Sequence, residues 1–242
     1  MTSPSHETPA KRGFPGAVKV AGSIGLCKSI DLPLALARKP CPAHKGIDAA
    51  ETCVVFRMRH YMKRAIIVHG WDGHPGECWF PWLKRELEKK GYFVEVPRMP
   101  QPDAPHIDRW VPALAGVVGK PDNKLVLIGH SCGCITILRY LESLPKGRIG
   151  KAVLVAGFTD PLGYKELENF FASPLEWKNI RSHCTDFVAI NSDNDQYVPL
   201  HHADVFRKNL GAKVIVEHGK GHMGGGDKMM QLPSALGAVM GE

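Results

Sequence analysis

The chain has 242 residues, of which 44% are hydrophobic and 23% charged, and its formal net charge is +7. These values are ordinary for one globular domain or at most two, and they exclude a chain that is disordered throughout. No stretch approaches about 18 apolar residues without a charge, so a membrane-spanning protein is excluded as well.

The positive charge is concentrated in the first quarter of the chain. Residues 1–61 hold nine Lys and Arg and four Asp and Glu, whereas residues 62–242 hold 22 and 20. The nearly neutral remainder has no dense basic stripe, which argues against nucleic acid as a partner. Because six prolines and five glycines interrupt residues 1–61, we interpret them as a poorly ordered extension, either a leader or a mis-assigned start before Met62.

From Lys63 onward, short apolar runs alternate with amphipathic segments. The runs predicted as strands are Arg64–His69, Tyr92–Val96, Lys124–Gly129, Lys151–Ala156, Asp186–Asn191 and Lys213–Glu217. The segments predicted as helices are Pro81–Lys90, Ile107–Val118, Cys132–Leu144, His201–Leu210 and Lys228–Val239. Apolar strands that alternate with helices indicate a parallel sheet covered on both faces. We therefore expect residues 62–242 to form one compact α/β domain with about six mainly parallel strands.

The third predicted strand leads directly into a candidate nucleophile. It is followed by Gly129-His130-Ser131-Cys132-Gly133 and then a helix, which is the G-x-S-x-G pattern of a nucleophile elbow in its expected strand–turn–helix context. The glycines leave room for a sharp, strained turn that exposes the Ser131 hydroxyl. The following helix directs its N-terminus at the serine and favours negative charge there. An ordinary serine in a βα loop is the alternative interpretation.

A serine nucleophile needs a base and an orienting acid, which follow it in this chain order in such folds. The loop after the fifth strand offers Asp193 and Asp195, and the loop after the sixth offers His218 and His222. We favour Asp195 as the acid, with Asp193 as a turn-former or helix cap. We favour His222 as the base because the flexible glycines before it allow it to reach back over the sheet.

Two backbone amides are candidates for an oxyanion hole, and a metal site is not expected. The amide of Cys132 follows the nucleophile, and the amide of Trp71 lies in the turn after the first strand. His69 and His130 are expected to make structural hydrogen bonds at strand ends. No closed set of metal ligands emerges, since the adjacent His201 and His202 are expected to point in different directions.

The quoted motifs resemble the α/β-hydrolase superfamily, and in particular the small serine hydrolases related to retinoblastoma-binding protein nine. The resemblance covers about residues 62–242 and rests on the segments MKRAIIVHGWDGHPGECWFPWL, GHSCG, SDNDQYVP and GKGHM. It implies a six-stranded, mainly parallel sheet, an enzyme start near Met62, and a triad of Ser131, Asp195 and His222. The chain has no Leu-x-Cys-x-Glu motif, so the retinoblastoma protein is not carried over as a partner.

These observations predict a serine hydrolase that cleaves a small ester or related acyl substrate without a cofactor. An insertion at Gly157–His183 is expected either to cap the site with an acyl pocket or to serve only as local core. The candidate pocket residues in it are Phe158, Leu162, Tyr164, Phe170, Phe171, Leu175 and Trp177. Amidase, peptidase or thioesterase activity and a non-catalytic binding or scaffold protein on the same fold are the alternatives. No membrane partner is expected. Seven irregularly spaced cysteines favour a reducing, cytoplasmic compartment over a disulfide framework.

Overall fold

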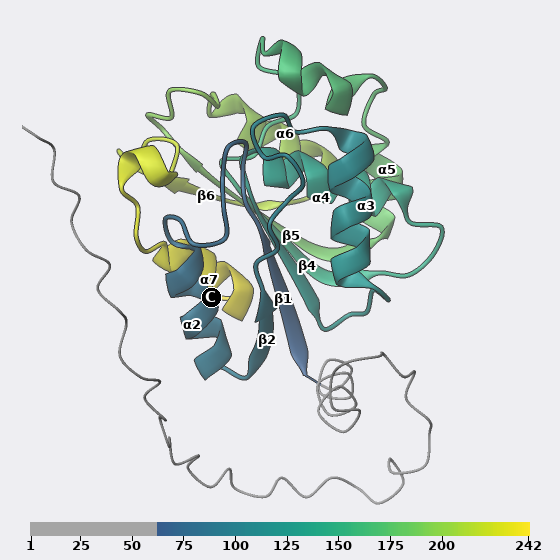
Figure 1. The fold of residues 1–242 in the computed structure, drawn as a ribbon, viewed down its shortest axis with the longest axis vertical. Helices are drawn as coiled ribbons and strands as arrows, with labels where there is room; N and C mark the ends of the chain where they lie inside the picture. Colours follow the sequence, from purple (N-terminus) through teal and green to yellow (C-terminus); the bar gives the residue numbers. More distant parts are fainter. Residues whose placement is uncertain (1–61) are drawn as a thin grey trace, which may run out of the picture. The chain divides into compact units, whose positions relative to one another are not determined.

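The computed structural model describes residues 62–242, which form a six-stranded sheet with helices on both faces (Figure 1). The strands are β1 (Lys63–Val68), β2 (Tyr92–Glu95), β3 (Leu125–His130), β4 (Ile149–Val155), β5 (Cys184–Ser192) and β6 (Lys213–Glu217). Every neighbouring pair is parallel, in the order β2-β1-β3-β4-β5-β6. The predicted α/β class is thereby confirmed. The predicted extension at 1–61 lies outside the described residues.

The helices cover the two faces of the sheet as two groups. Helices α2 (Phe80–Lys89) and α7 (Pro233–Met240) pack on one face, and α3 (Ile107–Val118), α4 (Cys132–Ser143), α5 (Trp177–Ser182) and α6 (His201–Leu210) pack on the other. Successive side chains of a strand point to opposite faces. In β1, Ala65 and Ile67 accordingly join the core under α2 and α7, whereas Ile66 and Val68 join the core under α3 and α4.

The strand order places a crevice at the carboxyl ends of β1 and β3. After β1 the chain moves outward to β2, and it then returns to the other side of β1 to form β3. Loops that leave two neighbouring strands in opposite directions open a crevice, which is where open α/β sheets bind ligands. Trp71 follows β1 and Ser131 follows β3, so the topology brings both to this crevice.

The predicted elements agree with the structure to within one or two residues at almost every boundary. The exception is the last helix, which was expected at Lys228–Val239 and instead begins at Pro233. Proline lacks the N–H that a helix interior needs and disfavours helical backbone in the residue before it, and Leu232 is accordingly non-helical, with φ −136° and ψ 83°. The preceding residues contain only the short 3₁₀ turn η3 (Gly225–Asp227).

Residues 157–183, here called the cap segment, connect β4 to β5. The segment contains the 3₁₀ helix η2 (Lys165–Phe171) and α5. Its aromatic and apolar residues divide between the two expected roles. Phe170 is fully buried in the core, and Phe171, Leu175 and Trp177 pack against it, whereas Phe158, Leu162 and Tyr164 line a cavity beside Ser131.

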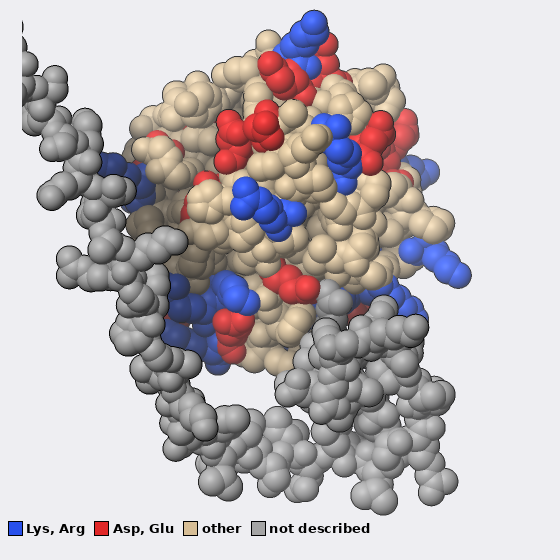
Figure 2. Space-filling model, viewed as in Figure 1, with Lys and Arg blue, Asp and Glu red and all other residues tan. Residues whose placement is uncertain are grey.

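No helix within residues 62–242 is long and apolar enough to cross a bilayer. Acidic and basic side chains are interspersed over the upper part of the face shown in Figure 2.

Candidate active site

Ser131 lies in the sharp turn that joins β3 to α4. Its backbone has φ 52° and ψ −117°, in the positive-φ region that residues with a side chain seldom adopt. Ser131 N donates to Val155 O (2.9 Å), and Ser131 O accepts from Cys134 N (2.9 Å). These two hydrogen bonds hold the strained turn at the end of the sheet, with the serine at the N-terminus of α4.

The glycines two residues before and after Ser131 are required by close packing. A Cβ on Gly129 would lie 2.8 Å from Cys134 N, and a Cβ on Gly133 would lie 2.8 Å from His69 O and closer still to Val68 O. All of these are backbone atoms, so neither contact can be relieved by turning a side chain. The spacing of the elbow therefore has a steric cause in this fold.

We expect Gly133→Ala to lower the free energy of unfolding by about 3 kcal/mol or more, since the added methyl overlaps the backbone of β1. Gly116→Ala is the matched control, because Gly116 is exposed in α3 and an added Cβ meets nothing within 4 Å. That change should stabilise the protein by up to about 1 kcal/mol. Urea denaturation of both variants measures the difference, and equal stabilities would contradict the steric argument.

The structure brings Asp195 and His222 together from the loops after β5 and β6. His222 Nδ1 donates to Asp195 Oδ2 (2.8 Å) and lies 3.1 Å from Oδ1. The Asp195 side chain is fully buried, whereas 14% of the His222 side chain is exposed. Asp195 Oδ1 also accepts hydrogen bonds from Tyr197 N (2.9 Å) and Val198 N (3.0 Å). These hydrogen bonds fix the carboxylate. Because Nδ1 is bound to Asp195, Nε2 is the free nitrogen of the His222 imidazole.

The alternative acid and base form a second pair on the surface. His218 Nδ1 lies 2.7 Å from Asp193 Oδ2, and Gly219 N donates to Asp193 Oδ1 (2.9 Å). The His218 side chain is 83% exposed. The hydrogen bond from Gly219 and the contact with His218 lower the pKa of Asp193. Because neither residue lines the cavities at Ser131, this pair is separate from the site.

Asn194, which sequence reasoning did not single out, ties the two loops together. Its Oδ1 accepts hydrogen bonds from Gly221 N (2.8 Å) and Ser192 Oγ (2.8 Å). Ser192 Oγ in turn accepts a hydrogen bond from Lys220 N (3.0 Å). These bonds fix the backbone just before His222. The signal was present in the sequence, since an amide between two aspartates in a polar loop commonly bonds to nearby backbone.

Buried rings hold the other side of the His222 loop. His130 Nε2 lies 2.9 Å from His222 O, which makes this nitrogen the donor, and Trp79 Nε1 donates to Met223 O (2.9 Å). His69 makes a comparable structural contact, since its Nε2 accepts from Met99 N (2.9 Å). The structural hydrogen bonds expected for His69 and His130 are therefore present.

Burial, together with the neighbouring His222, lowers the pKa of His130 to about 3. An unfolded histidine has a pKa near 6.5, so the unfolded chain binds an extra proton between about pH 6.5 and pH 3. The contribution of His130 to stability is therefore complete above pH 6.5 and is lost as the pH falls. In that window, we expect the free energy of unfolding to fall by roughly 1.4 kcal/mol for each unit by which the pH decreases.

This dependence is measured by urea denaturation of the wild type and His130→Gln between pH 7 and pH 4. The amide of the variant can still donate to His222 O but does not titrate. Burial also lowers the pKa values of His69 and His202, so both proteins lose stability in acid, but the variant should lose less per pH unit. Identical slopes would show that His130 does not carry this effect.

The turn after β1 places Trp71 against the nucleophile. Gly73 N donates to Gly70 O (3.1 Å), which closes the turn, and Trp71 Nε1 donates to Asp103 O (3.0 Å). A Cβ on Gly70 would lie 3.1 Å from the Ser131 Cβ, so this glycine permits the close approach. Cys132 is the first residue of α4, and its amide has no acceptor within the helix. Both amides proposed for an oxyanion hole thus belong to segments that adjoin Ser131.

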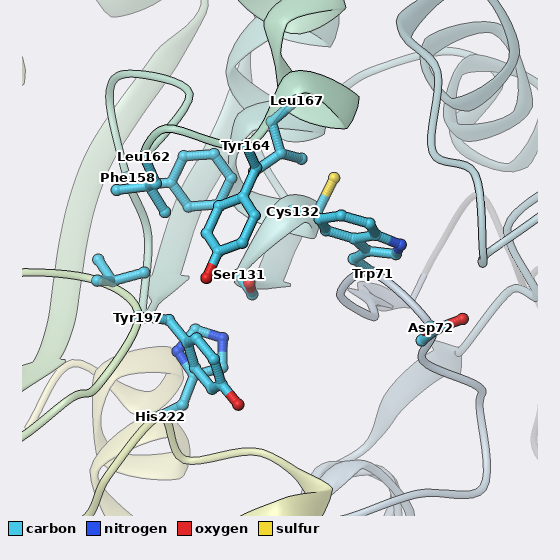
Figure 3. Close-up of a pocket in the computed structure, with 11 residues that line it drawn as sticks. Trp71, Asp72, Ser131, Cys132, Phe158, Leu162, Tyr164, Leu167, Tyr197 and His222 are labelled. Atoms are coloured by element: carbon cyan, nitrogen blue, oxygen red, sulfur yellow. The ribbon is translucent and has the colours of Figure 1, made fainter.

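Two cavities meet at Ser131 and His222. Figure 3 shows the first, of about 360 Å³, with largely apolar walls. They are formed by Trp71, Phe158, Leu162, Tyr164, Leu167 and Val198. The second, of about 240 Å³, is lined by three carboxylate residues and a run of glycines, namely Asp72, Glu77, Asp227 and Gly224 to Gly226.

Tyr197 lines both cavities, with its ring centroid 5.1 Å from that of His222. Neither Tyr197 nor the cavity residue Leu167 was anticipated, because the fold of their loops decides which side chains reach the site.

Ser131 and His222 line the same two cavities, and Figure 3 shows their side chains facing the same space. Within residues 62–242, no hydrogen bond joins the Ser131 hydroxyl to the imidazole. In ligand-free enzymes such bonds are often long and tighten only with substrate. Burial raises the pKa of the neighbouring Cys132 thiol far above its ordinary value, so this group is neutral and a poor nucleophile.

The expectation that His201 and His202 point apart is wrong. Their ring centroids lie 4.2 Å apart, and both rings face Asp160 from the first turn of α6. Neighbouring side chains diverge along a helix interior, but the imidazoles are long enough to converge at its first residues.

The comparisons with known proteins agree with this architecture. The serine hydrolase family model matches residues 65–239. YdeN of Bacillus subtilis is 31% identical over 163 residues, which are 66% of this chain and 85% of that protein. Serine hydrolase RBBP9 of Rattus norvegicus is 27% identical over 164 residues, which are 66% of this chain and 86% of that protein.

Solved structures show the same fold. The crystal structure of the Bacillus subtilis ydeN product superposes with a TM-score of 0.70 at 27% identity, and covers 74% of this chain and all of that one. Est1E of Butyrivibrio proteoclasticus, solved with ferulic acid bound, has a TM-score of 0.59 at 15% identity, and covers 73% of this chain and 86% of that one. From residue 65 to residue 239, the chain belongs to the serine hydrolase family.

Proposed function

We propose that the protein is a carboxylesterase-like hydrolase that cleaves small acyl substrates with Ser131, His222 and Asp195. The observation that carries the proposal is the buried Asp195–His222 pair, whose imidazole lines the same cavities as the strained Ser131. A serine becomes a nucleophile only when an oriented base can accept its proton. Each of these three side chains supplies one part of that requirement.

In the proposed mechanism, His222 Nε2 takes the Ser131 proton as Oγ forms a bond to the substrate carbonyl carbon. Asp195 holds the imidazole in the required tautomer and stabilises its cationic form. The amides of Trp71 and Cys132 donate to the oxyanion. One such donor typically raises the reaction rate by about a hundredfold or more. The C–O bond then breaks, and His222 gives its proton to the leaving alcohol. Water repeats the sequence on the acyl-enzyme and releases the acid.

The two cavities support an assignment of the two parts of the substrate. The apolar cavity suits the acyl group, since its walls offer little to hydrogen-bond a polar chain. The second cavity suits a leaving group with hydroxyl or amino donors, since Glu77 and Asp227 line it and not the first, whereas Asp72 lines both. Burial raises the pKa of Glu77 above its ordinary value.

A reducing, cytoplasmic setting is part of the proposal. Its support is that the four cysteines of residues 62–242 are all buried free thiols: Cys78, Cys132, Cys134 and Cys184.

A panel of p-nitrophenyl esters tests the proposal. We expect hydrolysis with kcat/KM at least about tenfold higher for acetate to hexanoate than for dodecanoate or longer esters, because a cavity of about 360 Å³ cannot enclose a long chain. Thioesters and aminoacyl amides of the same acyl size serve as competing substrates. Faster turnover of either would reassign the reaction, and the absence of turnover by folded protein with any of them would favour a binding protein.

A further inference from the structure

Away from Ser131, three potential metal ligands converge where the cap segment leaves β4. Asp160, His201 and His202 each place a ligand atom within 4.8 Å of the other two. This is the one such group of three His, Cys, Asp or Glu side chains in residues 62–242. The hydrolase mechanism uses none of them.

His202 carries a buried nitrogen without a partner. The side chain is 1% exposed, and its Nε2 makes no hydrogen bond. This atom faces Asp160 Oδ2 across 3.9 Å, which is too long for a hydrogen bond. A buried polar atom left unsatisfied is costly, so a partner between the two groups is chemically expected.

A metal ion can occupy this gap if the ligand atoms move closer together. Zinc bonds to imidazole nitrogen and carboxylate oxygen are roughly 2.0–2.2 Å long, so two ligand atoms at a tetrahedral angle on one ion are about 3.4 Å apart. The 3.9 Å between His202 Nε2 and Asp160 Oδ2 exceeds that separation by about half an ångström. The other separations, which are up to 4.8 Å, must close by up to about 1.4 Å, and the exposed His201 side chain is the one that can turn to close them.

The surroundings of both fixed ligands also suit a metal. His202 Nδ1 accepts a hydrogen bond from Thr159 N (3.2 Å) and lies 2.9 Å from Thr159 Oγ1, so without a metal the ring proton is on Nε2 and faces Asp160. A metal on Nε2 would move that proton to Nδ1, which would then donate to Thr159 Oγ1. Metal-bound histidines usually donate their other nitrogen to an outer partner in this way. Asp160 Oδ1 accepts from Leu162 N (2.9 Å), which leaves Oδ2 for the ion.

We propose that Asp160, His201 and His202 bind zinc or a similar transition-metal dication. Two imidazoles and one carboxylate are a ligand set for such metals, and water would complete the coordination. The ion would tie the start of the cap segment to α6. Phe158 and Leu162, which line the apolar cavity, flank Asp160 in the chain, so the site would brace that wall. This inference is independent of the proposed hydrolase activity.

Zinc titration of the chelator-treated full-length chain tests the site by calorimetry. Asp160→Asn and His201→Ala alter exposed side chains and should fold normally. We expect each to bind one zinc ion fewer than the wild type, or to bind that ion at least about tenfold more weakly. The wild-type melting temperature should rise with zinc by more than that of either variant, since a ligand that binds the folded state stabilises it.

His218→Ala is the matched control, because it removes an exposed histidine that also contacts an aspartate but belongs to no three-ligand group within residues 62–242. It should bind zinc as the wild type does. The proposal is overturned if Asp160→Asn and His201→Ala keep the wild-type zinc stoichiometry, affinity and melting shift. It also fails if His218→Ala loses the same ion.

Discussion

Replacement of Ser131 by alanine is expected to lower kcat for ester hydrolysis by about 10⁴-fold or more. The variant retains the cavities and the backbone amides but has no hydroxyl to attack the carbonyl, and removal of a serine nucleophile has effects of this size in other hydrolases. Initial rates with p-nitrophenyl butyrate, at several substrate concentrations, separate the change in kcat from any change in KM.

Ser182→Ala is the control for a serine-to-alanine change. Ser182 is exposed in α5, and its Oγ only donates to Asn179 O (2.7 Å). Its rate should stay within about twofold of the wild type, as is usual for exposed substitutions. Both variants should give wild-type circular dichroism. A Ser131→Ala protein that is folded and retains more than a tenth of the wild-type kcat would show that another group is the nucleophile.

The two aspartates of the loop after β5 are expected to differ strongly in their effect on the rate. Asp195→Asn should lower kcat by about 10⁴-fold, because an amide at this position can favour the wrong tautomer of His222. Asp193→Asn should change it by less than about threefold, since its partner His218 is on the surface and such pairs contribute little. The two variants make the same chemical change two residues apart.

Kinetics of both variants, with the corresponding pair His222→Ala and His218→Ala, check this assignment. The large losses should follow Asp195 and His222 only. If Asp193→Asn and His218→Ala were the inactive pair, the surface dyad would have to move to Ser131 during catalysis. Equal losses from both aspartate variants would indicate that the loop as a whole, and not one carboxylate, determines activity.

Most of the fold could be predicted because its signals are local. Apolar runs such as Leu125–His130 and the turn residues around them identify a buried strand without knowledge of its neighbours. The nucleophile elbow could be predicted for the same reason, since Gly129 and Gly133 are needed for close contacts at the strand–turn–helix unit. The start of the last helix was predicted wrongly. The apolar pattern continues on both sides of Pro233, but the helix begins only at this proline.

The features that could not be predicted depend on contacts between distant segments. The sequence favoured Asp195 and His222 among the two aspartates and two histidines of these loops, but the hydrogen bond from Gly221 N to Asn194 Oδ1, which joins the loops, was not anticipated. The cap segment supplies the cavity residue Leu167 but buries Phe170, three residues later, in the core. The convergence of His201 and His202 on Asp160 likewise depends on where the cap segment meets α6.

Mass spectrometry of the full-length protein after reaction with a fluorophosphonate probe tests the central claim most directly. The probe bonds covalently to a serine whose proton is removed by a neighbouring base. We expect one adduct per chain, located on Ser131 in the peptide that contains Gly129 to Gly133, and prevented by His222→Ala. An adduct on a different residue, or a folded protein that remains unlabelled, would contradict it.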